Sequence, residues 1–205
     1  MTRRPLNATS LVMVMIIVLC SACDASPEPA ANSEAVRETM TTTLEPLPEK
    51  LEVEGFQAVL ASTGNVYVGG QPSREALDWL KSEGVTAVVN LRTQPEMDDR
   101  ERVPYDEAAA LDSLGIEYVH LPMGGNGAPY TPAALERFAE IVDGSEGKVL
   151  LHCTVGWRAS HMWVAYLARY RGMELDEAIE HGRAINLGTQ PYEELLGNDM
   201  EPRGE

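Results

Sequence analysis

The amino-acid sequence predicts an α/β fold in which a mainly parallel central sheet is flanked by helices. From residue 65 onward, apolar runs of strand length alternate with segments of helical periodicity. The run KVLLHC (148–153) is too apolar for a half-exposed strand. Buried strands that alternate with helices are typical of a parallel sheet covered on both faces.

The first elements are a strand over NVYVGG (65–70) and a helix over 73–84. Gly69 and Gly70, with Gln71, Pro72 and Ser73, form a tight turn between them, and Ser73 caps the helix. Further strands are expected over 85–92, 116–122 and 148–153, and further helices over 105–115, 131–142, 160–170, 175–185 and 191–196. Thr131 and Pro132 open the helix over 131–142. The helix over 160–170 is apolar on nearly every side, which predicts a central, buried position.

The N-terminal segment has the layout of an export signal. Two arginines precede an apolar run over 11–20, and the small residues Ser21 and Ala22 stand before Cys23. The run is about half the ~20 residues that a membrane-spanning helix needs. One interpretation is an ordinary cleaved signal peptide. The favoured one is a bacterial lipoprotein signal, which residues 1–22 resemble and which implies lipid attachment at Cys23.

The rest of the chain divides into three expected parts. Residues 23–50 are rich in Pro, Ala, Thr and Glu, which predicts a disordered acidic tether. Residues 51–197 have the size of one domain, and residues 198–205 are expected to be a flexible tail. With a lipid on Cys23, the protein is expected to be anchored to a membrane on its periplasmic or extracytoplasmic face.

The formal net charge of −16 limits the classes of partner. Nucleic-acid binding needs a basic surface, so no nucleic acid is expected as a partner. An anionic substrate requires a local positive site that works against the overall field. Of three cysteines, Cys20 lies in the signal and Cys23 carries the lipid, so only Cys153 remains for the folded domain.

The stretch LLHCTVGWRAS (150–160) carries the candidate chemistry. A loop between a parallel strand and a buried helix directs free backbone N–H groups at one point, where an anion binds. The same N–H groups stabilise a thiolate at Cys153, Gly156 allows a positive φ or a close approach, and Arg158 can hold two oxygens of an oxyanion. The alternative is a buried structural thiol with an arginine that merely opens the helix.

At these residues the chain resembles the cysteine-dependent phosphatases of the protein tyrosine and dual-specificity type. It is most similar to their bacterial beta-lactamase hydrolase-like phosphatase domain. The resemblance runs over roughly residues 55–188 and includes GNVYVGGQPS, VTAVVNLR, VHLP, LLHCTVGWRAS and DEAIEHGRAINLG. It implies a phosphatase-like fold with a Cys loop and a cysteinyl-phosphate intermediate on Cys153. Phosphate would be held by Arg158 and by the amides of the loop Thr154, Val155, Gly156 and Trp157. The resemblance also implies supporting roles for His152 and Ser160. Ser160 stands one place after the position, directly behind the arginine, where the phosphatases have a hydroxyl residue.

The sequence departs from the phosphatase pattern in two ways. Only four residues separate Cys153 from Arg158, where tyrosine phosphatases have five, and this shorter loop is similar to that of rhodanese sulfurtransferases. The loop MGGNGAPYT (123–131) also lacks the carboxylate that serves as general acid in the phosphatases. Asp98, Asp99 and Glu96 are the candidate substitutes.

The remaining candidates have ordinary structural interpretations. Arg92 ends a strand at the same edge of the sheet as Cys153, where it could add positive charge near the pocket, although a surface arginine is the default. Trp157 either walls the pocket or packs against a helix. No metal is expected, because His120, His161 and His181 have no ligand spacing with one another or with carboxylates. No cofactor is expected either.

The leading hypothesis is a cysteine-dependent phosphatase that acts on an anionic small molecule or a phosphoprotein. The first alternative is a sulfurtransferase that carries a persulfide on Cys153. The second is a catalytically weak module that binds phosphorylated or sulfated partners through the same loop.

Overall fold

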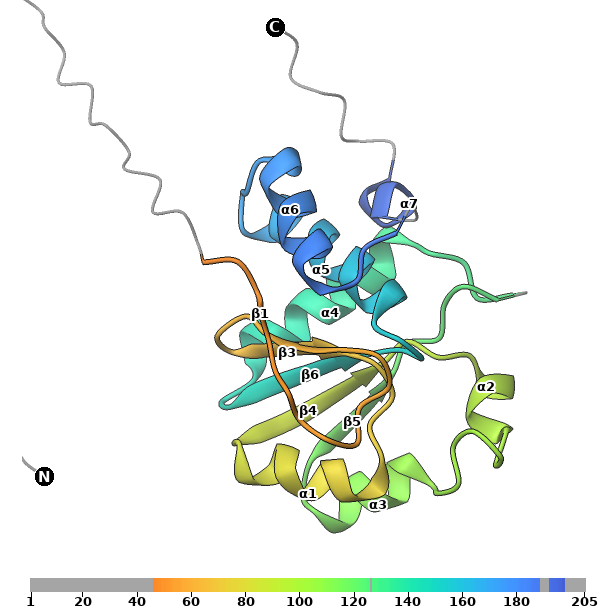
Figure 1. Cartoon of the computed structure of the whole chain (residues 1–205). Coiled ribbons are helices and arrows are strands. Elements are labelled where there is room, and N and C mark those ends of the chain that lie inside the picture. The colour runs from red at the N-terminus through yellow and green to blue at the C-terminus, as the bar shows by residue number, and fades with distance from the viewer. Residues whose placement is uncertain (1–45, 126, 189–191, 198–205) are drawn as a thin grey trace, which may run out of the picture. The chain divides into compact units, whose positions relative to one another are not determined.

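One mainly parallel sheet organises the computed structural model, which describes residues 46–125, 127–188 and 192–197 (Figure 1). Within these residues the sheet has six strands in the order β1-β2-β3-β6-β4-β5. Their bounds are β1 Glu49–Lys50, β2 Leu60–Ser62, β3 Val66–Gly69, β4 Val85–Asn90, β5 Glu117–His120 and β6 Lys148–His152. Strands β3, β6, β4 and β5 pair in parallel, whereas β1 and β2 add an antiparallel edge.

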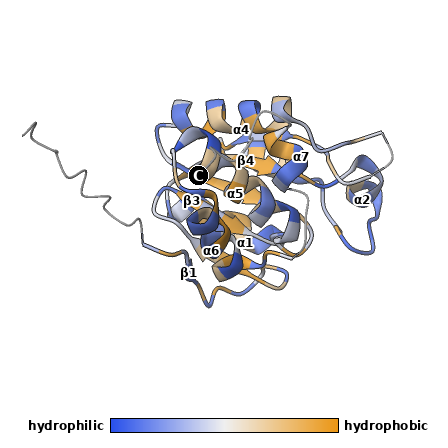
Figure 2. Cartoon of the chain, turned by 90° about the horizontal axis from the view of Figure 1, so that it is seen from above, coloured by the Kyte–Doolittle hydropathy of each residue, from blue (hydrophilic) through white to orange (hydrophobic). Residues whose placement is uncertain are grey.

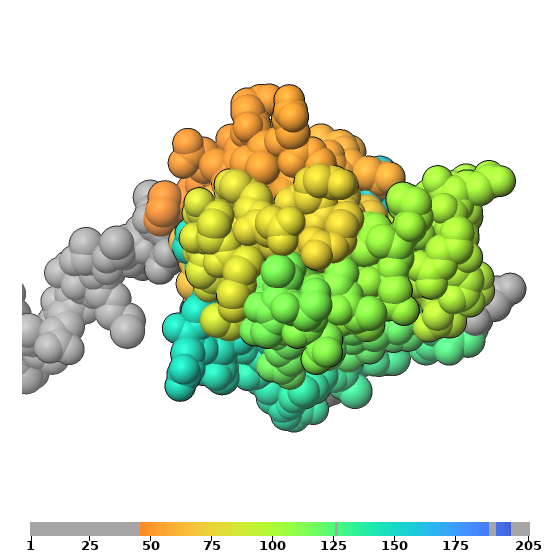
Figure 3. Space-filling model, turned by 90° about the horizontal axis from the view of Figure 1, so that it is seen from below, coloured from red at the N-terminus to blue at the C-terminus, as the bar shows by residue number. Residues whose placement is uncertain are grey.

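Helices cover both faces of this sheet. They are α1 Arg74–Ser82, α2 Gln94–Asp98, α3 Glu107–Ser113, α4 Pro132–Gly144, α5 Trp157–Tyr170, α6 Leu175–Ile185 and α7 Tyr192–Leu196. Helices α1 and α3 lie on the lower face, and α4 to α7 lie on the upper one (Figure 1). Seen from below, α1 in yellow and α3 in green cover the sheet beside the orange N-terminal segment (Figure 3). The predicted α/β class is confirmed.

Every strand and helix expected from residue 65 onward is present, with ends shifted by a few residues. Helix α5 begins at Trp157, three residues before its expected start, because the turn at Gly156 leads directly into it. Three elements were not predicted: β1, β2 and α2. Strand β1 takes in the last two residues of the segment expected to be a tether. The expected export signal, Cys23, the greater part of the tether and the tail over 198–205 lie outside the described residues.

The caps explain where the main helices begin. Ser73 Oγ accepts a hydrogen bond from the amide of Ala76 at the start of α1, and Thr131 Oγ1 accepts one from Ala134 at the start of α4. Each side chain pairs an amide that has no partner within its own helix. Both caps were expected from the sequence.

Two hydrophobic clusters fill the space between the layers. The larger one joins the upper face of the sheet to α4 and α5, with Phe138, Met162 and Tyr166 among its buried members. The smaller one joins the lower face to Leu77 and Leu80 of α1 and to α3. Helix α5 lies between α4 and α6 (Figure 2), and its residues from Arg158 to Leu167 are all buried. Its expected central position is therefore confirmed.

A bulge in β4 lets one strand serve both clusters. The pairing of β4 with β6 shifts between Val85 and Ala87. Val85 consequently faces the lower cluster, while Ala87 faces the upper one, although residues two apart normally share a face. At their carboxyl ends the parallel strands are level, since Gly69 and Asn90 both lie opposite His152.

Among the described residues, no helix combines the length and the apolar character that crossing a bilayer requires.

Candidate active site

The loop from Cys153 to Gly156 joins the central strand β6 to α5, and the neighbouring strands hold it in place. The amide of Cys153 donates to Gly69 O at 3.3 Å, and the amide of Gln71 donates to Thr154 O at 3.0 Å. Gly70 forms a bridge with Val155. The loop is therefore tied to β3 on one side, at the sheet edge where α/β proteins bind ligands.

Gly156 is required at the last position of the loop. It has φ 82° and is the N-cap of α5. A Cβ at this position would lie 2.6 Å from Cγ1 of Val59, closer than two carbon atoms can pack. The positive φ that the sequence indicated is present. The contact with Val59 was not predicted.

Cys153 is a free thiol that is 1% exposed. Two arginines stand near it, from α5 and from the end of β4. Burial alone would lower the pKa of Arg158, but the hydrogen bond to Glu96 and the negative charge of a Cys153 thiolate raise it. A thiolate at this position is thus paired with a cation, which is what a nucleophilic cysteine needs.

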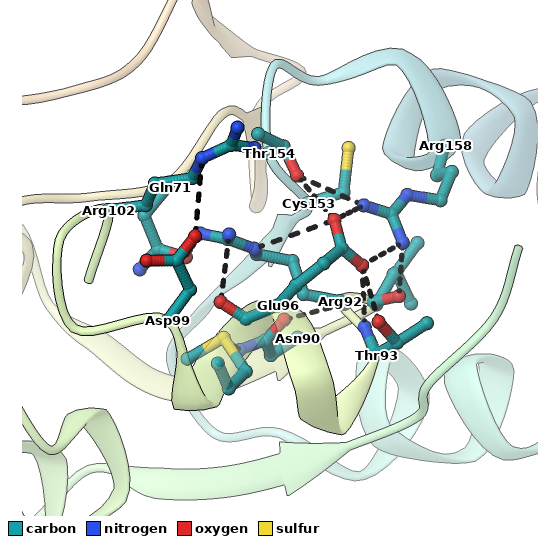
Figure 4. A network of polar contacts seen from close by, with 12 residues as sticks. Gln71, Asn90, Arg92, Thr93, Glu96, Asp99, Arg102, Cys153, Thr154 and Arg158 are labelled. Atoms are coloured by element: carbon teal, nitrogen blue, oxygen red, sulfur yellow. Dashed lines mark hydrogen bonds and ion pairs between the residues drawn. The ribbon is translucent and has the colours of Figure 1, made fainter. Parts of the chain in front are cut away.

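Arg158 projects from the first turn of α5 and is fully engaged at its terminal nitrogens. Its NH1 donates to the carbonyl oxygens of Leu91 at 3.2 Å and Met123 at 2.8 Å. Its NH2 donates to Thr154 Oγ1 at 3.0 Å. These contacts fix the guanidinium beside the loop that carries Cys153 (Figure 4).

Glu96 of α2 binds the same guanidinium at two points. Its Oε1 lies 2.6 Å from NH2 and its Oε2 lies 2.9 Å from NH1 of Arg158, and Thr154 Oγ1 donates to Oε1 at 2.9 Å. Burial alone would raise the pKa of Glu96, but the hydrogen bonds from Arg158 and from the Thr93 amide lower it to about 2. Glu96 is therefore an anion at neutral pH (Figure 4).

Arg92 is buried, so the expected surface position was wrong. Its side chain is 1% exposed, and NH1 donates to Gln71 Oε1 at 2.7 Å while NH2 donates to Glu96 O at 3.1 Å. Its Nε makes no hydrogen bond with a described residue. Burial lowers the pKa of Arg92, although the Glu96 carboxylate opposes this. The Arg92 side chain is directed inward, where Gln71 Oε1 and the carbonyl of Glu96 in α2 accept its hydrogen bonds.

A buried polar cluster supports the loop from below. His152 Nε2 lies 3.2 Å from Glu107 Oε1, at ion-pair distance, and both side chains are almost fully buried. Asn90 Nδ2 donates to Glu107 Oε2 at 2.8 Å, and Gln71 Nε2 donates to Oε1 at 3.3 Å. The sequence indicated a supporting role for His152. It did not indicate Glu107, because an acidic residue in the first turn of a helix is usually exposed.

The other residues of the loop and its neighbourhood have structural contacts. Trp157 packs edge-on against His161, with the ring centroids 4.7 Å apart, and its Nε1 lies close to Gly188. Ser160 Oγ donates to Gly156 O at 2.8 Å, within its own helix. Val155 is an exposed apolar residue of the loop, and its carbonyl accepts a hydrogen bond from Asn186 at 2.7 Å.

The two aspartates considered as general acids lie in or next to α2. Asp98 is exposed and accepts a hydrogen bond from Gln94 at 2.9 Å. Asp99 forms an ion pair with Arg102 at 3.3 Å. Among the described residues, neither carboxylate contacts the loop from Cys153 to Gly156.

A protein-family model described as "DSP-PTPase phosphatase fused to NAD+ Kinase" matches residues 38–195. Among curated proteins, the chain is 33% identical over 135 residues to "Probable NAD kinase 2, chloroplastic" of Oryza sativa subsp. japonica. It is 28% identical over 123 residues to the beta-lactamase hydrolase-like protein of Xylella fastidiosa strain 9a5c. These alignments cover 63% and 59% of the chain, but only 14% and 28% of the two relatives.

Solved structures have the same fold. Tk-PTP in its active form is 28% identical with a TM-score of 0.54, and the alignment covers 65% of this chain and 89% of Tk-PTP. PTPMT1 is 22% identical with a TM-score of 0.52, and the alignment covers 64% of this chain and 86% of PTPMT1. The expected phosphatase-like fold is confirmed.

Proposed function

Since this chain belongs to the family of DSP-PTPase phosphatase domains fused to NAD+ kinase, we propose that it is a cysteine-dependent phosphatase. Its substrate is a phosphomonoester, carried either by an anionic small molecule or by a phosphoprotein. Cys153 is the nucleophile and forms a cysteinyl-phosphate intermediate. Arg158 and the amides of Thr154, Val155, Gly156 and Trp157 hold the transferring group.

The observation that carries this proposal is the position of Cys153 relative to Arg158. The thiol ends the central strand, and the guanidinium leaves the first turn of the helix that follows. Contacts with Leu91, Met123 and Thr154 fix the guanidinium there without a ligand. A fixed cation and a helix N-terminus are the groups that stabilise the charge of a transferring phosphoryl group.

The reaction proceeds in two displacements. In the first, the Cys153 thiolate attacks phosphorus, the bond from phosphorus to the ester oxygen breaks, and the alcohol leaves with one added proton. In the second, water attacks the cysteinyl phosphate, the bond from sulfur to phosphorus breaks, and inorganic phosphate leaves. The thiolate is regenerated, so each cycle consumes one ester and one water.

Glu96 sets a condition on substrate binding. Its carboxylate already occupies both terminal nitrogens of Arg158. A phosphate group must therefore approach through the loop amides and Nε of Arg158, or move the carboxylate aside. The two negative charges repel each other, which favours substrates whose remaining parts add binding energy of their own.

Turnover of para-nitrophenyl phosphate by the full chain, beside its Cys153→Ser variant, tests the proposal. The expected result is turnover by the native protein and none by the variant, with trapped phosphate on Cys153 after rapid acid quenching. Equal activity of the two proteins would overturn it. Transfer of sulfur from thiosulfate to cyanide, without phosphate release, would instead assign the short loop to persulfide chemistry.

The proposal extends to the location of the enzyme. An export signal over 1–22 and a lipid on Cys23 would place the phosphatase on a membrane outside the cytoplasm. Metabolic labelling with a fatty-acid analogue is expected to mark the native chain and not its Cys23→Ala variant. Unlabelled native chain would favour an ordinary cleaved signal peptide or a protein that is not exported.

A further inference from the structure

The loop between β5 and α4 brings a tyrosine to the candidate active site. Within this loop, the amide of Met123 donates to Leu91 O at 3.1 Å and the carbonyl of Met123 accepts from Arg158. Hydrogen bonds between Gly124 N and Ala128 O, and between Ala128 N and Gly125 O, close a turn within it. It ends at Thr131, the cap of α4. Tyr130 therefore stands between an anchored turn and a capped helix.

The hydroxyl of Tyr130 lies beside Arg158. A Cβ placed on Gly124 would be 2.5 Å from the Tyr130 hydroxyl oxygen and 3.1 Å from Cδ of Arg158. Both side chains thus occupy the space that Gly124 leaves open, at φ 85°. The ring of Tyr130 packs against the upper hydrophobic cluster, which also contains Cys153. Within the described part of the chain, its hydroxyl makes no internal hydrogen bond.

The charges around Tyr130 keep its proton in place. Burial raises the pKa of Tyr130, Arg158 opposes this, and the negative charge of a Cys153 thiolate raises the pKa further. The phenol therefore stays protonated at neutral pH. A group that keeps its proton at this pH meets the requirement for proton donation.

The nearby carboxylates do not meet this requirement. Glu96 is held as an anion, with its pKa lowered to about 2 against the effect of burial by hydrogen bonds from Arg158 and Thr93. Asp98 and Asp99 are directed to Gln94 and Arg102. Tyr130 combines a neutral hydroxyl, a position beside Arg158 and a donor that has no acceptor among the described residues.

We propose that Tyr130 is the proton donor to the leaving oxygen in the phosphomonoester hydrolysis proposed above, on which this inference rests. When the thiolate of Cys153 displaces the ester oxygen, the phenolic proton of Tyr130 passes to that oxygen and the alcohol leaves neutral. The phenolate then takes a proton from the water that attacks the cysteinyl phosphate. Tyr130 returns to the phenol, and the proton count of the cycle closes.

The test compares two aryl esters in the Tyr130→Phe variant of the full chain. Phenyl phosphate has a basic leaving group that needs a proton, whereas para-nitrophenyl phosphate has a weakly basic one that scarcely does. The variant is expected to lose about 100-fold or more in kcat/KM, which reports the first displacement, on phenyl phosphate and to stay within about twofold in kcat/KM on para-nitrophenyl phosphate. Tyr170→Phe, at an exposed tyrosine of α5, is the matched control and should leave both rates unchanged.

A second variant, Gly124→Ala, displaces the Tyr130 hydroxyl without removing it. In Gly124→Ala the new Cβ meets the Tyr130 hydroxyl at 2.5 Å and Cδ of Arg158 at 3.1 Å. The loss on phenyl phosphate is therefore expected to exceed the loss on para-nitrophenyl phosphate, while circular dichroism reports a folded protein. Equal losses on the two esters with Tyr130→Phe, or no loss with that variant, would refute the role of Tyr130. If the native chain and Cys153→Ser are equally inactive on both esters, the phosphatase function itself fails and this role falls with it.

Discussion

The carboxylate of Glu96 faces the guanidinium of Arg158 edge to edge, with Oε1 2.6 Å from NH2 and Oε2 2.9 Å from NH1. Such two-point contacts between charged groups are stronger than single hydrogen bonds. The contact connects α2 to the first turn of α5, two elements that the sequence separates by the whole of α3, β5, α4 and β6. The contribution of this contact to stability can be measured from the pH dependence of the unfolding free energy and from substitutions of Glu96 and Arg158.

Acid is expected to weaken the native protein through Glu96. Hydrogen bonds from Arg158 and Thr93 outweigh the effect of burial and lower the pKa of this carboxyl from 4.5 to about 2 in the folded state. The stabilisation is present above pH 4.5 and is lost as the pH falls toward 2. A shift of this size corresponds to at most about 3 kcal/mol, less the solvent screening at a partly exposed side chain. Urea unfolding at several pH values measures it.

Glu96→Gln is the reference for that experiment. The amide cannot ionise, so the difference in unfolding free energy between native protein and variant should be largest near pH 6 and shrink toward pH 3. A difference that stays constant across this range would mean that the carboxylate gains nothing from Arg158.

Arg158→Lys is expected to reduce both activity and stability, although it preserves the charge. A lysine ammonium cannot reach the carbonyls of Leu91 and Met123 together with the carboxylate of Glu96. Loss of one fixed donor to the transferring group typically costs about 100-fold in kcat, and unpaired buried acceptors cost about 1–3 kcal/mol each. Turnover of para-nitrophenyl phosphate and urea unfolding measure the two effects.

Arg171→Lys is the matched control for this substitution. Arg171 pairs with Asp143 at 2.8 Å on an exposed surface, where an ion pair contributes little. The control should keep its activity and most of its stability. If the two lysine variants behave alike, the contacts of Arg158 do not matter for either property.

Gly156→Ala is expected to destabilise the protein through two separate effects. The residue has φ 82°, which an alanine adopts at a cost of about 1–2 kcal/mol. The added Cβ also collides with Val59, 2.6 Å away, and such overpacking costs about 1–3 kcal/mol more. Thermal and urea unfolding measure the sum.

Gly64→Ala separates the two effects, because Gly64 has φ 90° and no atom within 4 Å of an added Cβ. It should show the backbone cost alone. Equal destabilisation at the two positions would show that Val59 moves aside freely, and the loop would then be more adaptable than its packing indicates.

The sequence predicts the parts of this site that depend on local pattern. The apolar run of β6, the glycine at the end of the loop and the arginine in the first turn of α5 are all readable from spacing, because each follows from the strand-to-helix connection itself. The caps at Ser73 and Thr131 are readable for the same reason. The family resemblance supplies the phosphatase-like fold.

The features that the sequence does not predict depend on contacts between distant segments of the chain. Arg92 is buried only because Gln71, from the turn after β3, offers it an acceptor. Glu107 is buried only because the fold brings His152 and Asn90 next to it. Strand β2 has three residues and α2 has five, which is too short for periodicity to distinguish them from loop.

The central place of β6 in the sheet also affects when the candidate site can form during folding. Strand β6 is the last strand of the sheet in chain order, yet it lies at the centre, between β3 and β4. In a nascent chain from which β6 has not yet emerged, the segments that form β3, β4, α1 and α3 have already been synthesised. Pairing between segments so far apart is slow to find. Cys153 and Arg158 directly follow β6 in the sequence, so they reach their positions beside β3 and β4 only when β6 inserts between those two strands.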